Sequence, residues 1–230
     1  ADRKKKICYV SFGAGSGAEQ VYGSILEAAG RLDDYIFVIS NAGVDRLLDE
    51  QGYSVSSTKR NNVKFVEAAN GTKVYLTSQE QIDHMKTVAL ADIMIQGNGS
   101  ATTYESIAAQ TPMVCIPLNR PGYEQLIKGV GVELSGSGKV LFLDEVQDQL
   151  KSFRDLTHQD GNLPAKKYTT DSLVDAIGAV QKDYGNYKDA LCGMQTYFAD
   201  PYVTAQVLKD MSLGHEVQRI IRNNGLKSFR

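Results

Sequence analysis

The chain has 230 residues, of which 42% are apolar and 23% are charged, the composition of an ordinary globular protein. Its 25 Lys and Arg residues nearly balance 27 Asp and Glu residues, and a net charge of −2 argues against a general nucleic-acid binder. Three cysteines are too few for a disulfide framework, and no apolar run approaches the roughly 18 residues of a membrane span. Cys8 and Cys115 stand inside apolar runs, which indicates buried free thiols in a reducing compartment.

The first two thirds of the chain alternate short apolar strands with amphipathic helices. Strands are predicted at residues 7–12, 35–39, 63–66, 74–76, 92–96, 112–118 and 140–143. Helices are predicted at residues 18–32, 44–51, after a capping box formed by Ser78 and Gln81, at 101–110 and around 123–128. Residues 53–62 are expected to form a loop. This alternation is typical of an α/β fold, and we expect a Rossmann-like parallel sheet with helices on both faces.

Beyond residue 150 the pattern is helical. Helices are predicted at residues 170–182, 187–198, 202–211 and 215–222. Residues 154–167 contain a glycine and a proline without periodicity, and we expect a surface connection there. The sequence therefore predicts one domain, with a tail or linker at 1–6, a Rossmann-like core at 7–150 and a helical extension at 151–230.

Two glycine-rich loops each follow a predicted strand and open a predicted helix. The first, Gly13–Ala18, has the form G-x-G-x-x-A, and the second is Gly97–Thr103. Glycines let the backbone approach a phosphate, and a helix N-terminus supplies free N–H groups. The pair predicts a diphosphate at the carboxyl edge of the sheet, with helix dipoles balancing its charge. For the first loop, a plain tight turn between strand and helix remains the alternative.

Two common phosphate sites do not fit these loops. A dinucleotide site needs an acidic residue at the end of the second strand, and this strand ends Ile39-Ser40-Asn41. A P-loop needs Lys followed by Ser or Thr after its glycines, and neither loop has this pair. The nicotinamide-cofactor and P-loop classes are therefore disfavoured.

Glu105, six residues after Gly99, has two interpretations. It completes a capping box with Thr102, which would be purely structural. It also fits a carboxylate one turn into the helix, facing the crevice, where it could accept hydrogen bonds from two ribose hydroxyls. Both interpretations stay open at this stage.

The remaining reactive residues indicate no metal site. His84, His158 and His215 are far apart and lack partners at metal-ligand spacing. We expect His84 to lie at the surface or at its boundary. Cys192 has no neighbouring histidine in the sequence, so a nucleophilic role is disfavoured.

The stretch from Met85 to Pro117 resembles the carboxyl-terminal half of GT-B glycosyltransferases, in the branch of the peptidoglycan N-acetylglucosaminyltransferase and the plant galactolipid synthases. In that branch a Glu follows the glycine loop by six residues and a Pro follows the Glu by seven, as Gly99, Glu105 and Pro112 do here. A Gln-rich segment follows the next Pro, matched here by Glu124-Gln125. The first loop is similar to the family's Gly-Gly-Ser-Gln-Gly-Ala, and the resemblance covers about residues 7–150.

The resemblance implies a role for each matching position. The residues facing the diphosphate would be Gly13, Ala14, Gly15, Ser16, Gly17, Asn98, Gly99, Ser100, Ala101 and Thr102. Glu105 would hold the ribose, and Leu76, Thr77 and Ser78 would lie beside the base. Glu124 and Gln125 would contact hydroxyls of the donor sugar, with an ordinary exposed helix start as the alternative. Related enzymes carry a His where this chain has Gly97, and Asp-Gln or Gln-Gln where it has Glu124-Gln125.

The activity implied by the resemblance is metal-independent glycosyl transfer from a nucleotide-sugar, most simply a UDP-sugar, without a cofactor. In this fold the catalytic base belongs to an acceptor-binding domain, so the chain is expected to bind nucleotide and to be inactive alone. The implied partner is that domain or subunit, and the implied location is cytoplasmic, with peripheral membrane association through the partner.

Two alternatives to this activity remain. The chain could be a donor-binding subunit that is active only with a separate membrane-bound acceptor subunit, or an enzyme like the UDP-sugar 2-epimerases. The first residue is Ala1 rather than Met, and a basic run precedes the first strand. We expect a cut from a longer protein or a naturally split subunit.

Overall fold

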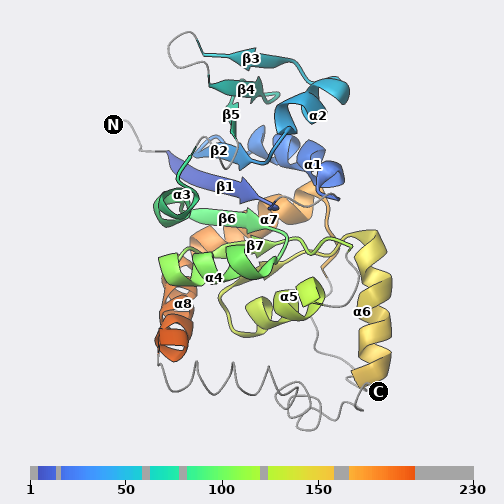
Figure 1. The fold of residues 1–230 in the computed structure, drawn as a ribbon, viewed down its shortest axis with the longest axis vertical. Helices are drawn as coiled ribbons and strands as arrows, with labels where there is room; N and C mark the ends of the chain where they lie inside the picture. Colours follow the sequence, from blue (N-terminus) through green and yellow to red (C-terminus); the bar gives the residue numbers. More distant parts are fainter. Residues whose placement is uncertain are drawn as a thin grey trace.

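The computed structural model describes residues 5–13, 17–58, 63–77, 82–119, 124–157 and 166–199. These residues form an eight-stranded sheet in the order β3-β4-β5-β2-β1-β6-β7-β8, shown in Figure 1. The strands are β1 (Lys6–Ser11), β2 (Tyr35–Ser40), β3 (Val55–Ser57), β4 (Lys64–Glu67), β5 (Lys73–Thr77), β6 (Ile93–Gln96), β7 (Met113–Cys115) and β8 (Gly138–Val140).

Six neighbouring strands of the sheet pair in parallel, and their order across the sheet is β5-β2-β1-β6-β7-β8. Numbered along the chain, this is the order 3-2-1-4-5-6 of the doubly wound Rossmann fold, whose ligands bind where the strand order reverses. The reversal lies between β1 and β6, so the loops after these two strands flank the crevice. The predicted α/β fold is confirmed.

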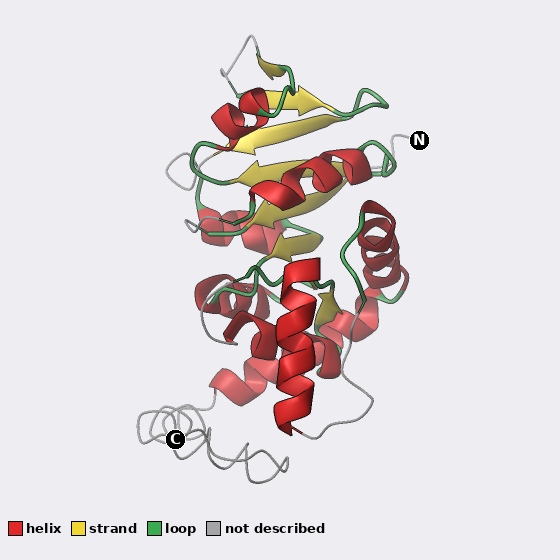
Figure 2. Cartoon of the chain, turned by 90° about the vertical axis from the view of Figure 1, so that its right-hand side faces the viewer, coloured by secondary structure: helices red, strands yellow, loops and turns green. Residues whose placement is uncertain are grey.

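The helices cover both faces of the sheet. They are α1 (Glu19–Ala29), α2 (Val44–Glu50), α3 (His84–Leu90), α4 (Ser100–Ala109), α5 (Glu124–Leu134), α6 (Asp144–Thr157), α7 (Thr170–Lys182) and α8 (Tyr184–Ala199). Helices α3 and α4 pack together on one face, and α1 and α7 pack together on the other (Figure 1). Figure 2 shows the same fold after a quarter turn, with a helix lying across the strands in front of them. No helix in the described ranges is long and apolar enough to cross a membrane.

The parallel strands are apolar along their length because helices bury both of their faces. All four residues of β6 are buried, and so are Cys8 to Ser11 of β1. The strands at the opposite edge of the sheet, β3 and β4, are different, since they run antiparallel and two of the three β3 residues are exposed. The loop predicted at residues 53–62 is therefore wrong at Val55–Ser57, where backbone pairing with β4 forms a strand that has no fully buried residue.

Several predicted boundaries shift. Helix α7 has the predicted bounds, whereas α8 begins at Tyr184 instead of residue 187. Helix α6 extends to Thr157 and so includes the first residues of the surface connection predicted at 154–167. The helix has a buried side, since Val146 and Leu150, four residues apart, are both buried. Strand β7 is shorter than predicted and lies between two prolines, which cannot donate to a sheet. The helices predicted at 202–211 and 215–222 lie outside the described residues.

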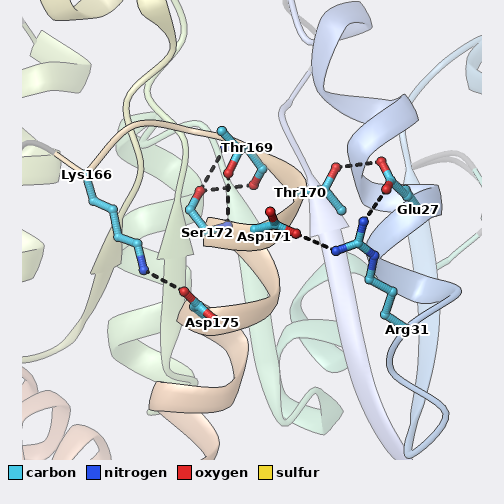
Figure 3. A network of polar contacts seen from close by, with 8 residues as sticks. All are labelled: Glu27, Arg31, Lys166, Thr169, Thr170, Asp171, Ser172 and Asp175. Atoms are coloured by element: carbon cyan, nitrogen blue, oxygen red, sulfur yellow. Dashed lines mark hydrogen bonds and ion pairs between the residues drawn. The ribbon is translucent and has the colours of Figure 1, made fainter.

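Helix α7 begins with a hydrogen-bonded cap, drawn in Figure 3. The Thr169 hydroxyl accepts from the Ser172 amide at 3.0 Å, and the Ser172 hydroxyl accepts from the Thr169 amide at 2.8 Å. Next to it, Arg31, two residues after the end of α1, donates to Asp171 at 2.5 Å, but both side chains are exposed to solvent. The cap therefore contributes more to stability than the ion pair does.

Replacing Thr169 by Ala is expected to lower the free energy of unfolding by about 1 kcal/mol, because one amide of the first turn loses its acceptor. Replacing Asp171 by Asn, two residues further along the chain, serves as the control and should change stability less. Urea denaturation of both variants measures the difference. Equal stability of the Thr169→Ala variant and the wild type would contradict this account of the cap.

Candidate functional site

The first loop leaves β1 at the reversal point. Gly13 has φ +70° and Gly17 has φ +98°, backbone conformations that favour glycine, and a Cβ on either would meet no described atom within 4 Å. The Gly17 amide donates to the Glu19 carboxylate at 2.6 Å. Ala14, Gly15 and Ser16 lie outside the described residues. The positive φ values at these two positions explain why glycine stands just after the end of β1 and again just before α1.

The second loop leaves β6 and opens α4. Asn98 is fully buried with φ +60°, and its amide donates to the Gln125 carbonyl oxygen at 3.3 Å. Gly99 is the N-cap of α4, and no described side chain caps this helix end. The Thr102 hydroxyl donates to the Gly99 carbonyl oxygen at 3.2 Å. The first-turn amides of α4 therefore remain available to an anion in the crevice.

The positively charged side chain of Lys128 lies beside this helix end. The Ser100 hydroxyl donates to the Glu124 carboxylate at 2.6 Å, and the Lys128 ammonium contacts both groups. Hydrogen bonding from Lys128, and then from Ser100, lowers the pKa of Glu124 below its ordinary value. Sequence reasoning missed Lys128 because it lies in neither loop. The signal was the four-residue spacing from Glu124, which places the two side chains on one face of α5.

Gln125 forms hydrogen bonds both with the segment before α5 and with the second loop. Its side-chain oxygen accepts from the Leu118 amide at 2.9 Å, while its backbone oxygen accepts from Asn98. The structure thus brings Glu124 and Gln125 to the second loop from a different part of the chain. Their contact with a donor sugar stays a prediction.

Glu105 points to α3 rather than to its own helix end. Its Oε2 lies 2.9 Å from Nε2 of His84, whose Nδ1 lies 2.8 Å from the Tyr9 hydroxyl. The capping box of Thr102 and Glu105 is wrong, because α4 begins one residue after Gly99 and Glu105 already lies in its second turn. His84 is a boundary residue, as expected, but no sequence pattern revealed its two partners.

The edge of β5 completes the described part of the crevice. Leu76 is buried, and the Thr77 carbonyl oxygen accepts from the Asn41 amide at 3.1 Å. Ser78 and the predicted capping box with Gln81 lie outside the described residues. Helix α3 itself begins at His84, with Asp83 as a side-chain N-cap.

Substitution of two glycines of α5 tests how closely this helix packs against the second loop. A Cβ on Gly129 would lie 2.7 Å from the Asn98 amide nitrogen and 3.1 Å from Pro117 Cγ, whereas a Cβ on Gly131 would meet no described atom within 4 Å. We expect Gly129→Ala to lower the free energy of unfolding by about 1–3 kcal/mol and to displace Asn98. Gly131→Ala should raise it by up to about 1 kcal/mol. Denaturation of this pair is the measurement, and equal effects would contradict the packing described here.

The chain is similar to known proteins in its fold rather than in its sequence. Neither the family models nor the curated proteins give a match to this sequence. Among solved structures, the chain is similar to the spinosyn rhamnosyltransferase SpnG, with a TM-score of 0.56 and 14% identity over 91% of this chain and 45% of that one. SpnG complexed with thymidine diphosphate gives a TM-score of 0.55 and 14% identity, over 88% and 42% of the two chains.

The glycosyltransferase SsfS6 of Streptomyces sp. SF2575, also complexed with thymidine diphosphate, gives a TM-score of 0.52 and 13% identity over 91% of this chain and 42% of that one. The fold is that of one half of a GT-B glycosyltransferase. At these identities the likeness concerns the fold alone, and the chain spans less than half the length of the structures it matches.

Proposed function

We propose that this chain binds the diphosphate of a nucleotide-sugar at the carboxyl edge of its sheet, as the donor-binding part of a glycosyltransferase. The observation that carries the proposal is the N-terminal end of α4 beside Gly99, which no side chain in the described ranges caps and which lies at the reversal point between β1 and β6. An anion there would meet first-turn amides and the positive end of the helix dipole. SpnG and SsfS6, which share the fold, have both been solved with thymidine diphosphate.

Different elements would bind different parts of the nucleotide-sugar. The diphosphate would lie between Gly13–Gly17 and Asn98–Thr102, with the Lys128 ammonium adding a positive charge. The ribose would bind the Glu105 carboxylate, and the base would lie near the end of β5. The donor sugar would extend towards the start of α5, where Glu124 stands.

The reaction would be attack of an acceptor hydroxyl on the anomeric carbon, with departure of the nucleoside diphosphate. Negative charge develops on the leaving diphosphate, and amides oriented towards it stabilise that charge without reorganisation. We propose that no metal ion is needed, because the N-terminal end of α4 and the Lys128 ammonium stabilise the negative charge of the leaving diphosphate. We assign no catalytic base to the chain and propose that an acceptor-binding domain or subunit supplies it.

The length of the matched structures favours such a partner. The match covers 45% of the SpnG chain, so an enzyme of that size would have a second part of similar length. We propose that this part is either a neighbouring domain or a separate subunit, and that any membrane association of a cytoplasmic complex comes through it. The chain alone is then expected to bind nucleotide without turnover.

Calorimetric titration with UDP, TDP, ADP and GDP tests the proposal. At least one of them should bind with a dissociation constant below millimolar, UDP most tightly, and the affinity should be the same with EDTA present. Glu50→Gln is a suitable control, because Glu50 is exposed at the end of α2 and its ion pair with Arg46 is long, at 3.6 Å. If none of the four binds below millimolar, the chain is not a donor-binding domain.

A further inference from the structure

We propose that His84 is a positioning residue that holds the Glu105 carboxylate in place for the ribose hydroxyls. The inference rests on the proposed function, since it concerns the residue that would bind the ribose. Three elements supply the parts, with Tyr9 on β1, His84 at the start of α3 and Glu105 in α4. Sequence spacing gives no hint of the arrangement, because 75 positions separate Tyr9 from His84 and 21 separate His84 from Glu105.

The three side chains form a graded path from the core to the crevice. Tyr9 is fully buried, and the His84 and Glu105 side chains are 16% and 27% exposed. The Tyr9 and His84 rings pack with centroids 5.4 Å apart and planes tilted by 58°. His84 is therefore held both by ring packing and by the hydrogen bond to the Tyr9 hydroxyl.

The direction of the hydrogen bonds follows from the Tyr9 proton. Burial, and to a smaller extent the charge of Glu105, raise the pKa of Tyr9 above its ordinary value. The phenol therefore keeps its proton and can donate it to Nδ1 of His84. With Nδ1 as the acceptor, the imidazole carries its N–H on Nε2, which donates to Oε2 of Glu105.

Two serines support the buried end of this path. Tyr9 is in register with Val38, so Ser11 and Ser40, two residues further along β1 and β2, face the same side of the sheet as Tyr9. Both hydroxyls are buried, and hydrogen bonding from them to the Tyr9 oxygen opposes the rise of the Tyr9 pKa. The Tyr9 oxygen thus has potential donors nearby, which leaves its own proton for His84.

A bond from His84 selects one conformation of a side chain that otherwise has several. A glutamate on a helix surface loses much rotamer freedom when it binds a ligand, and a preformed contact removes part of that cost beforehand. The His84 contact uses Oε2, so Oε1 and the second lone pair of Oε2 are directed away from the imidazole. These are the acceptor sites that two adjacent ribose hydroxyls need.

The test compares two substitutions of His84 and two ligands. His84→Met removes the donor, and His84→Gln keeps an N–H that can reach Glu105. We expect His84→Met to weaken UDP binding about tenfold, as the loss of one charge-assisted hydrogen bond does. Binding of 2′,3′-dideoxy-UDP should barely change, and His84→Gln should restore most of the UDP affinity. Lys86→Met on the exposed side of the same helix is the control and should leave both affinities unchanged.

The outcomes separate the two proposals. A wild-type chain that does not bind UDP overturns the proposed function and this inference together. If UDP binds the wild type but His84→Met weakens both ligands equally, or neither, only the positioning role is overturned. Tyr9→Phe covers the case in which His84→Met fails to fold, since it removes one hydroxyl and preserves volume. It should weaken UDP binding by a smaller factor and leave the dideoxy analogue unaffected.

Discussion

Replacing Glu105 by Gln is expected to weaken UDP binding by about 10- to 100-fold, which corresponds to the loss of roughly 1.5–3 kcal/mol from hydrogen bonds to a charged group. The substitution keeps the shape of the side chain and an oxygen that can accept from His84, so the fold should be unchanged. Calorimetric titration of the purified variant gives the affinity, and its thermal unfolding gives the stability.

The control for this substitution is Glu50→Gln, which removes the same charge from the exposed end of α2. It should bind UDP as the wild type does. If the Glu105→Gln variant also binds UDP with wild-type affinity, the proposed ribose role of Glu105 is wrong, whatever the nucleotide specificity proves to be.

The largest effect on stability is expected for Gly138→Ala. Gly138 is in β8, opposite Met113 of β7, and a Cβ there would lie 2.4 Å from the Met113 carbonyl oxygen and 2.8 Å from Val132 Cγ1. The nearest of these atoms belongs to the backbone of β7, which is paired with β6 on one side and β8 on the other, so it cannot move aside cheaply. We expect a loss of about 3 kcal/mol or more in the free energy of unfolding.

Gly178→Ala is the matched control, because a Cβ on this glycine of α7 meets no described atom within 4 Å. It should stabilise the protein by up to about 1 kcal/mol through helix propensity. Urea denaturation of both variants gives the comparison. A Gly138→Ala variant as stable as the wild type would mean that β8 does not pack against β7 as described.

The sequence predicts the central sheet and both loops well because their causes are local. Short apolar runs such as Ile93–Gln96 indicate strands buried on both faces, and the glycines after β1 and β6 indicate turns, where Gly13 and Gly17 have positive φ. Helix α7 is predicted with its observed bounds because Leu173, Ile177 and Val180 recur at helical spacing.

The parts that sequence reasoning missed depend on contacts between distant segments. The pairing of His84 with Glu105 exists because α3 and α4 pack together, and nothing near either residue indicates it. Lys128 reaches Ser100 only because α5 lies beside the second loop. Strand β3 is formed by backbone pairing with β4 and has no apolar pattern. Spacing along the chain predicts local structure, whereas these contacts follow from tertiary packing.

Backbone amide shifts of the isotopically labelled chain, followed during titration with UDP, test the central claim most directly. We predict that the largest changes occur in the amides of Gly13, Gly17, Gly99–Thr102 and Glu105, at the carboxyl edge between β1 and β6. Changes of similar size at the opposite edge of the sheet, around Tyr35 and Lys73, or no changes at millimolar UDP, would contradict a diphosphate site between the two loops.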